Sequence, residues 1–433
     1  MKKVRFLTLG CKVNQYETQA MRESLLRRGL SETKEGPCDV VVINTCTVTE
    51  QADRENRYWI RRLRRENPDA KVVVTGCWVQ RNRKEIEALP GIDLILSNRE
   101  KEELAERLFP GCATPEIQEG ERRYDRLQIS SFQGHARAFV KIQDGCNHAC
   151  SFCKVVLVRG RYRSRPLPAI VEEVKRLRDS GFREIVLTGI QLGAYGSDQE
   201  PRLSLVSVLE ALVSIAAIER VRLSSIEPTD VKPDLVEAMK TLPGVCPQLH
   251  VPLQSGDDEI LKHMNRRYGR DFYRDLIRRL RSEIPDFCLS MDVMAGFPGE
   301  EEAHFQNTLS LVDETRPIRV HAFPYSRRPG TRADRFPNLP TAVVQERMGR
   351  LLAFSKEIVH RERKNFLGRT FPVLVEKRSP REGFYQGHTP HYLKVSFESS
   401  EDFLGQTVGV RLQDVGEEGL IGQCVGGWIE SRS

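Results

Sequence analysis

Three cysteines close together in the sequence form the densest group of candidate metal ligands. Cys146, Cys150 and Cys153 lie in the segment DGCNHACSFC, with the spacing C-x3-C-x2-C. Three nearby thiolates can hold one iron–sulfur cluster, which normally takes four protein ligands, so one iron would stay open for a substrate or cofactor. A structural zinc site, with His148 or another residue as the fourth ligand, is the alternative that this spacing leaves open.

Three other cysteines are distant in the sequence but have similar surroundings. Cys11, Cys46 and Cys77 occur in GCKVN, NTCTV and GCWVQ, separated by 35 and 31 residues. Each ends a β-branched run, and the carboxyl ends of neighbouring parallel strands meet at the sheet edge where such folds place ligands. We therefore predict that these three thiols converge. The alternative is three independent buried cysteines that act as small hydrophobic residues.

The segments that must position these cysteines predict an α/β protein of three domains. Over residues 4–109, apolar runs alternate with helical patterns, which predicts an N-terminal parallel α/β sheet domain covered on both faces. Six strand–helix units follow from residue 138 and predict an open, partial (β/α)6 barrel, with its site at the carboxyl ends of the strands. Short strands after residue 368 predict a small C-terminal β-barrel, OB-like in kind. The predicted boundaries are 1–111, 112–135 for a linker, 136–367 and 368–433.

Composition limits the class of protein. Of 433 residues, 39% are hydrophobic and 29% are charged, as in globular proteins, and no apolar run approaches the roughly 18 residues of a membrane span. Eleven cysteines are too few for a disulfide scaffold, and the first residues do not resemble a signal peptide, so we expect a cytoplasmic protein with no membrane segment. The net charge of +7 favours a polyanionic partner without requiring one.

Basic residues near the cysteines are candidates for RNA contact. Four arginines alternate in RGRYRSR, directly after the cysteine array, and in an extended segment all four would point one way: Arg159, Arg161, Arg163 and Arg165. The C-terminal domain is net acidic overall, so RNA contact there would need a local patch that combines charge with stacking. The candidates for that patch are Lys377, Arg378, Arg381 and Lys394 with Tyr385 and Tyr392.

Together these features resemble the radical S-adenosylmethionine (SAM) methylthiotransferases over nearly the whole chain. The cysteine array looks like the radical SAM signature, the strand-end cysteines match the family's N-terminal domain, and the last segment looks like its RNA-binding TRAM domain. The segments TGIQLGAYG, RLSSIEP, HVPLQSG, MNRRYGR, DVMAGFPGE and FPYSRRPGT follow in the family's order. LGCKVNQYET and YQGHTPHYLKV look most like the branch that acts on threonylcarbamoyladenosine in tRNA. Lys154 and Val156 depart from the pattern, because members usually have an apolar residue and a proline there.

The resemblance implies a transferase with two [4Fe-4S] clusters and SAM. Cys146, Cys150 and Cys153 would hold the cluster that reduces SAM, whereas the other cysteine triad would hold the cluster that presents the sulfur. The substrate would be N6-threonylcarbamoyladenosine at tRNA position 37, next to the anticodon, and the product its 2-methylthio derivative. Just past predicted strand ends lie the candidate contacts to SAM or substrate, Gly189, Glu227 and Gln254.

The resemblance also implies partners for the enzyme, and other functions stay open. The expected partners are the tRNA and an electron donor of flavodoxin or ferredoxin type, with the chain acting as a monomer. Basic or hydroxyl-bearing residues should read the threonylcarbamoyl group, and the candidates are Lys12, Asn14 and Arg327. Alternative substrates are isopentenyladenosine in tRNA and an aspartate of a ribosomal protein. A zinc-stabilised RNA-binding protein is the alternative that is not an enzyme.

Overall fold

The N-terminal domain is built on a parallel sheet of five strands. Each strand pairs in parallel with its neighbours, in the order β2-β1-β3-β4-β5. The computed structural model describes residues 1–110 and 127–428. The strands are β1 (Lys3–Thr8), β2 (Ser31–Glu32), β3 (Val40–Thr45), β4 (Lys71–Gly76) and β5 (Leu94–Ile95).

Helices cover both faces of this sheet, as predicted. Val40 and Val42 belong to a core with residues of the first and last helices of the domain, whereas Val41 and Ile43 belong to a second core with the other two α-helices. Strands buried on both faces are continuous apolar runs, which is why they were recognisable in the sequence. The helical segments are α1 (Lys12–Leu26), α2 (Glu50–Glu66), α3 (Val79–Glu87), η1 (Glu100–Glu103) and α4 (Leu104–Leu108).

The central domain is the predicted open barrel. Its parallel strands form two three-stranded sheets, in the orders β10-β9-β6 and β11-β12-β13. Isolated parallel bridges from Val221 to Val245 and from Ser225 to His250 connect the two sheets. The strands are β6 (Arg137–Lys141), β9 (Glu184–Thr188), β10 (Arg220–Leu223), β11 (Gln248–His250), β12 (Cys288–Ala295) and β13 (Arg319–Pro324).

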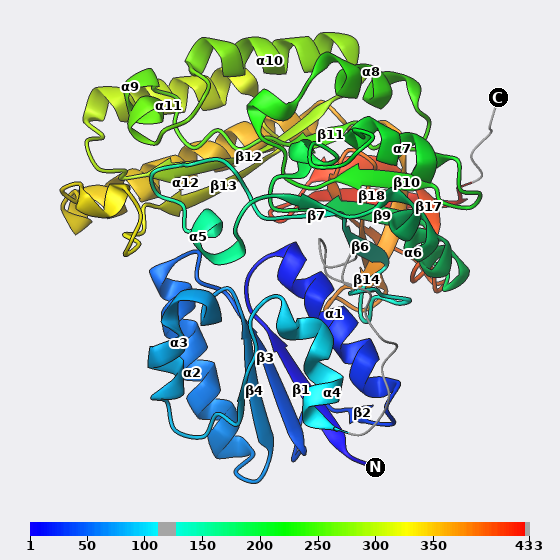
Figure 1. Ribbon diagram of the computed structural model, residues 1–433. Helices are drawn as coiled ribbons and strands as arrows, with labels where there is room; N and C mark the ends of the chain where they lie inside the picture. The colour runs from blue at the N-terminus through cyan, green and yellow to red at the C-terminus, as the bar shows by residue number, and fades with distance from the viewer. Residues whose placement is uncertain (111–126, 429–433) are drawn as a thin grey trace.

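Helices surround the outside of these strands and enclose one large core. Figure 1 shows the N-terminal domain (blue to cyan) next to the barrel (green to yellow), with the short helix α5 at their junction. The longer helices are α6 (Leu167–Asp179), α7 (Leu205–Val213), α8 (Pro233–Thr241), α9 (Asp258–His263), α10 (Arg270–Glu283), α11 (Glu302–Thr315) and α12 (Thr341–Lys364). The short segments are β7 (Gln143–Asp144), α5 (Val155–Arg159), β8 (Arg163–Ser164), η3 (Leu192–Ala194), η4 (Pro228–Asp230) and η5 (Ala333–Arg335).

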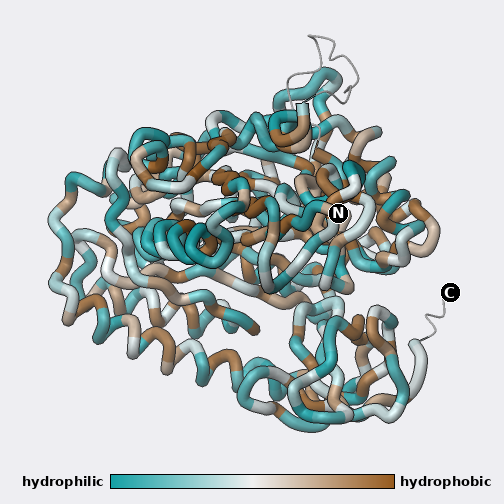
Figure 2. The backbone as a smooth tube through the Cα atoms, turned by 90° about the horizontal axis from the view of Figure 1, so that it is seen from below, coloured by the Kyte–Doolittle hydropathy of each residue, from teal (hydrophilic) through white to brown (hydrophobic). Residues whose placement is uncertain are grey.

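The C-terminal domain is a closed barrel in the strand order β14-β15-β16-β18-β17. It appears in Figure 2 as a lobe beside the C-terminus, in which hydrophobic and hydrophilic residues alternate. This alternation places Val395 and Phe397 in the barrel core. The strands are β14 (Thr370–Arg378), β15 (Phe384–His388), β16 (Lys394–Glu398), β17 (Thr407–Val415) and β18 (Leu420–Gly427).

The predicted linker, residues 112–135, is described only from residue 127 onward. There Leu127, Ile129 and Phe132 are buried in the core of the central barrel. Glu23 on α1 accepts hydrogen bonds from the backbone N–H groups of Ser130 (2.9 Å) and Ser131 (3.0 Å). This part of the segment therefore joins the N-terminal domain to the barrel through specific contacts. In the described residues no helix is long and apolar enough to cross a membrane.

Candidate active site

The strand-end cysteines come together at the carboxyl edge of the N-terminal sheet. Cys46 and Cys77 directly follow β3 and β4, and Cys11 is the residue before α1. Burial, together with the nearby thiols of Cys77 and Cys11, raises the pKa of Cys46 to about 12. None of the three is in a disulfide. The three thiols therefore lie close together, as their strand-end positions predicted.

Two glycines allow this approach. Gly10 has φ +98°, and an added Cβ there would lie 2.8 Å from the sulfur of Cys46. Gly76 has φ +106°, and its added Cβ would lie 2.3 Å from the carbonyl oxygen of Thr45. Both conformations strain residues with a side chain. Glycine before Cys11 and before Cys77 is thus what lets these loops meet.

The second triad lies in the loop between β7 and α5. The backbone N–H of His148 donates to Cys146 Sγ (3.3 Å), that of Val155 donates to Cys153 Sγ (3.4 Å), and Arg266 donates to Cys150 Sγ (3.1 Å). Burial, together with the neighbouring thiols, raises the pKa of Cys146 to about 12 and that of Cys153 to about 11.

This donor set suits a soft metal or an iron–sulfur cluster. Unbridged thiols that are buried beside one another resist ionisation, and coordination to a metal removes that penalty. The three hydrogen bonds to sulfur supply donors of the kind that tune such clusters. The residues present therefore fit the group that the C-x3-C-x2-C spacing predicts.

Arg159 contacts the triad of the N-terminal domain, and its position corrects one prediction. Its guanidinium donates to Cys77 Sγ (3.2 Å), to Glu17 Oε1 (2.8 Å) and to Asp144 Oδ1 (3.1 Å). Arg165 is also buried, in an ion pair with Glu173 (2.5 Å). The predicted row of four RNA-facing arginines is therefore wrong for these two. The segment is not one extended strand, because Arg159 ends α5 and only Arg163 and Ser164 form β8.

Among the other predicted RNA contacts, Tyr385 is buried in the core of the C-terminal barrel, so the prediction that it stacks on RNA is wrong. The predicted cations remain accessible. Arg161 is exposed, and Arg163 is partly exposed at 3.7 Å from Asp144. Lys377 and Arg378 are exposed on the C-terminal barrel, where Arg378 also pairs with Asp402 (2.6 Å).

The candidate SAM contacts occupy different surroundings. Gly189 directly follows β9, and an added Cβ there would lie 2.9 Å from Oε1 of Gln143. This oxygen accepts hydrogen bonds from the backbone N–H groups of Ile190 and Gln191. Glu227 pairs with Arg266 (2.5 Å), the residue that donates to Cys150. Gln254 is 7% exposed and adopts φ +66°. Its buried Oε1 has no hydrogen-bond partner among the described residues, which leaves it free for a ligand.

One cavity of about 520 Å³ is lined by residues of both triads, including Cys77 and Cys153. Its volume is within the usual range of ligand sites. Gln254 also lines it. A single ligand in this space would lie between the two cysteine triads.

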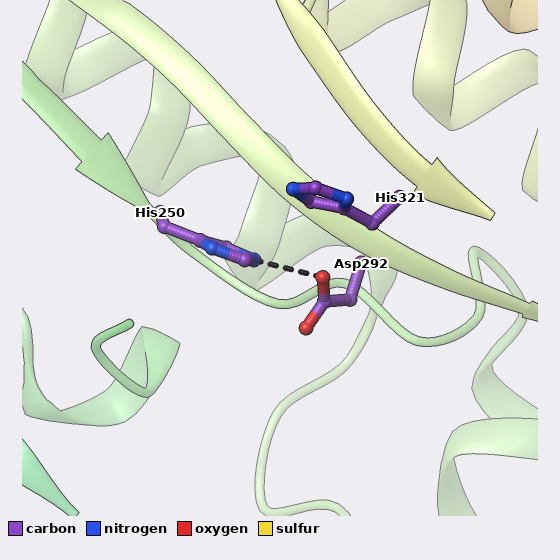
Figure 3. Close-up of side chains that lie close together, drawn as sticks. All are labelled: His250, Asp292 and His321. Carbon is purple, nitrogen blue, oxygen red and sulfur yellow. Dashed lines mark hydrogen bonds and ion pairs between the residues drawn. The ribbon is translucent and has the colours of Figure 1, made fainter. Parts of the chain in front are cut away.

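His250, Asp292 and His321 line the same cavity and were missed by the sequence analysis. His250 Nε2 lies 2.9 Å from Asp292 Oδ1, and the two imidazole rings stack at 5.6 Å (Figure 3). Burial, together with the charge of Arg319, lowers the pKa of His321 to about 4. The three residues come from β11, β12 and β13, so strand register alone brings them together.

Lys154, which departs from the family pattern, also lines this cavity, and the sequence analysis did not predict that position. It is 8% exposed, precedes α5 and borders this cavity and a neighbouring one of about 540 Å³. Val156 lies in the first turn of α5, a position that also tolerates proline, so the helix forms without it.

The three residues expected to read the substrate do not line the cavity between the triads. Asn14 is buried and donates to the carbonyl oxygens of Leu9 (2.7 Å) and Thr45 (3.0 Å). Arg327 pairs with Asp334 (2.7 Å), and the ammonium of Lys12 lies 5.9 Å from the ring centre of Phe139.

Three family models match successive parts of the chain. The model of the Radical SAM superfamily matches residues 140–312, that of the uncharacterized protein family UPF0004 matches residues 3–97, and that of the TRAM domain matches residues 364–425. Among solved structures, the radical SAM methyltransferase TsrM from Kitasatospora setae has a TM-score of 0.56 at 17% identity, covering 77% of each chain. That likeness supports the fold alone.

Curated relatives are similar over almost their full length. The chain is 40% identical to the threonylcarbamoyladenosine tRNA methylthiotransferase MtaB of Chlamydia pneumoniae, covering 97% of this chain and 98% of that protein. It is 35% identical to MtaB of Bacillus subtilis, covering 98% and 97%. It is 34% identical to a tRNA-2-methylthio-N(6)-dimethylallyladenosine synthase of Clostridium botulinum, covering 96% and 95%. With its cysteine triads and three matching domains, the chain belongs to the radical SAM methylthiotransferases and is an enzyme of the transferase class.

Proposed function

We propose that this enzyme converts N6-threonylcarbamoyladenosine at tRNA position 37 to its 2-methylthio derivative. The observation that carries this proposal is the single cavity lined by Cys77 of one triad and Cys153 of the other. An adenine held there would have one ring edge near both sets of thiols. The similarity to relatives named for threonylcarbamoyladenosine supports the choice of base.

The radical SAM family implies one [4Fe-4S] cluster and SAM, and Cys146, Cys150 and Cys153 are its candidate ligands. We propose that Cys11, Cys46 and Cys77 hold a second cluster. When bound, these groups would supply an electron for SAM cleavage and a sulfur for transfer. Glu227 and Gln254 would orient SAM or the base, and Gly189 would keep the end of β9 close to Gln143.

The surroundings of Cys77 support an anionic group at the second site. Lys101, Lys141 and Arg159 are buried with the two carboxylates of Glu17 and Asp144. Arg159 from this group donates a hydrogen bond to the sulfur of Cys77. A guanidinium at this distance favours a thiolate, which is the form of cysteine that binds a metal or an iron–sulfur cluster.

Phosphates of the tRNA would contact exposed cations around the mouth of the site. The candidates for these phosphate contacts are Arg161, Arg163, Lys377 and Arg378. A further cavity of about 810 Å³ lies between the central and C-terminal barrels, and its lining includes Arg137, Arg319 and Lys394. The electron donor of flavodoxin or ferredoxin type and the monomeric state stay predictions.

The test uses anaerobically reconstituted enzyme with two tRNAs offered separately. We expect methylthiolation of the threonylcarbamoyl tRNA, measured by mass spectrometry of nucleosides, and iron with inorganic sulfide in the protein. The 34% identity to dimethylallyladenosine synthases makes the isopentenyl tRNA the second candidate. Equal or faster reaction with it would overturn the proposed substrate. Zinc without sulfide would overturn the cluster assignment.

A further inference from the structure

We propose that Lys154 binds the carboxylate of the threonylcarbamoyl group and so selects this base over isopentenyladenosine, an inference that rests on the proposed function. Lys154 directly follows Cys153 and is 8% exposed. It lines the cavity that both cysteine triads share. It also borders the neighbouring cavity of about 540 Å³, so it lies where the two spaces meet.

Lys154 is the one lysine or arginine among the residues that line this cavity. Its other charged or titratable members besides the two cysteines are His250, Asp292, His321 and Tyr325. Asp292 already contacts His250 at 2.9 Å, and much of the remaining lining is apolar, including Phe152, Met294 and Phe323. An anionic substituent in this cavity would thus have Lys154 as its cationic partner.

The carboxylates near Lys154 are already paired with arginines. Asp53 contacts Arg328 at 2.6 Å, and Asp334 contacts Arg327 at 2.7 Å. No ion pair or hydrogen bond is present between the ammonium of Lys154 and any residue within 1–110 or 127–428. An ammonium without a counterion in the protein is available to pair with the carboxylate of a ligand.

The two candidate bases differ in the group that Lys154 would meet. Threonylcarbamoyl carries a carboxylate, which forms a short charge-assisted hydrogen bond with an ammonium. Isopentenyl is apolar and would remove water from the ammonium without replacing its hydrogen bonds. A site with such a polar group strongly rejects an analogue that leaves the group unpaired. The ammonium of Lys154 would therefore distinguish the two bases by their charge.

The test compares two RNA substrates with four enzymes. The substrates are an anticodon stem-loop carrying threonylcarbamoyladenosine and the same RNA with the carboxylate converted to a primary amide. The enzymes are the wild type, Lys154→Gln, Lys154→Arg and the control Lys262→Gln, which changes an exposed lysine of α9. The readout is the ratio of kcat/KM for the acid to that for the amide. Iron content and SAM cleavage without RNA report whether each variant keeps its cluster.

We expect the wild type, the Lys262→Gln control and Lys154→Arg to prefer the acid by about 10- to 100-fold. Lys154→Gln should reduce this preference to within about threefold. An unchanged preference in Lys154→Gln, or an equal loss on both RNAs as for a phosphate contact, would overturn the inference. So would a wild type that does not distinguish acid from amide, whatever the variants do. A wild type that leaves the threonylcarbamoyl RNA unmodified, or prefers the isopentenyl RNA, would instead overturn the proposed function.

Discussion

Replacement of Arg159 by glutamine tests whether this buried arginine holds the N-terminal domain to the barrel. The side chain belongs to the barrel domain, and its contacts include Glu17, Asn14 and Cys77 of the N-terminal domain. It also contacts Asp144 in its own domain. Glutamine keeps a polar side chain but lacks the charge and the five donors of the guanidinium.

The contacts that survive the substitution set the expected magnitude. Removing one partner of a buried ion pair typically costs about 3–5 kcal/mol. Here Lys101 and Lys141 continue to pair with Glu17, and Lys141 also lies 3.4 Å from Asp144. Because neither carboxylate is left without a cation, we expect the lower end, about 3 kcal/mol. For domains of this size that corresponds to a decrease in Tm of roughly 10 °C.

The assay measures thermal unfolding of the apoprotein by calorimetry, with Arg161→Gln as the matched control. Arg161 undergoes the same chemical change two residues away, but it is exposed. Its effect should stay within about 0.5 kcal/mol, as at most surface positions. If Arg159→Gln were within about 1 kcal/mol of this control, the buried ion pairs would not hold the two domains together and the reasoning would be refuted.

Three further predictions follow from the site and its supporting charges. Replacing Cys146, Cys150 and Cys153 by alanine should abolish formation of 5′-deoxyadenosine. Replacing Cys11, Cys46 and Cys77 by alanine should stop sulfur transfer but preserve some SAM cleavage. Full iron content in this second variant would contradict the second cluster. Neutralising Arg161 and Arg163 should weaken tRNA binding and reduce the slope of log affinity against log salt by about one to two, and an unchanged slope would contradict phosphate contact. Although burial opposes ionisation, Arg222, Arg137 and Arg220 lower the pKa of Glu184 from 4.5 to about 2. Its stabilisation, up to about 3 kcal/mol, should be full above pH 4.5 and decline as the pH falls toward 2, so urea unfolding of Glu184→Gln should depend less on pH in this range.

Local sequence patterns were sufficient for most strands but not for all of them. The apolar runs of β1, β3 and β4 are long enough to be recognised from composition alone. β2 has only two residues and carries no periodicity, and β15 has the mixed sequence FYQGH, so neither was predicted. Both strands form because partners elsewhere in the chain complete their hydrogen bonds. Such pairing is a tertiary effect that a short segment does not encode.

The alternating arginines show how a local pattern can mislead. Spacing of two predicts one face only in an extended segment, but here the chain passes from helix α5 through a turn at Gly160 to the two-residue strand β8. Arg159 and Arg165 are buried because carboxylates from α1, β7 and α6 reach them. Charge alone could not distinguish these ion pairs from contacts with phosphate.

The sequence by itself determined which thiols group together and which family they indicate. Cys146, Cys150 and Cys153 are confined by their short covalent spacing, and the strand-end positions of Cys11, Cys46 and Cys77 follow from parallel pairing. Tertiary structure alone decided that both triads border one cavity, that strand register brings His250, Asp292 and His321 together, and that Lys154 has no ion-pair partner among the described residues. The physical reason is that burial and ion pairing depend on segments tens to hundreds of residues apart, whereas sequence patterns report only on neighbours along the chain.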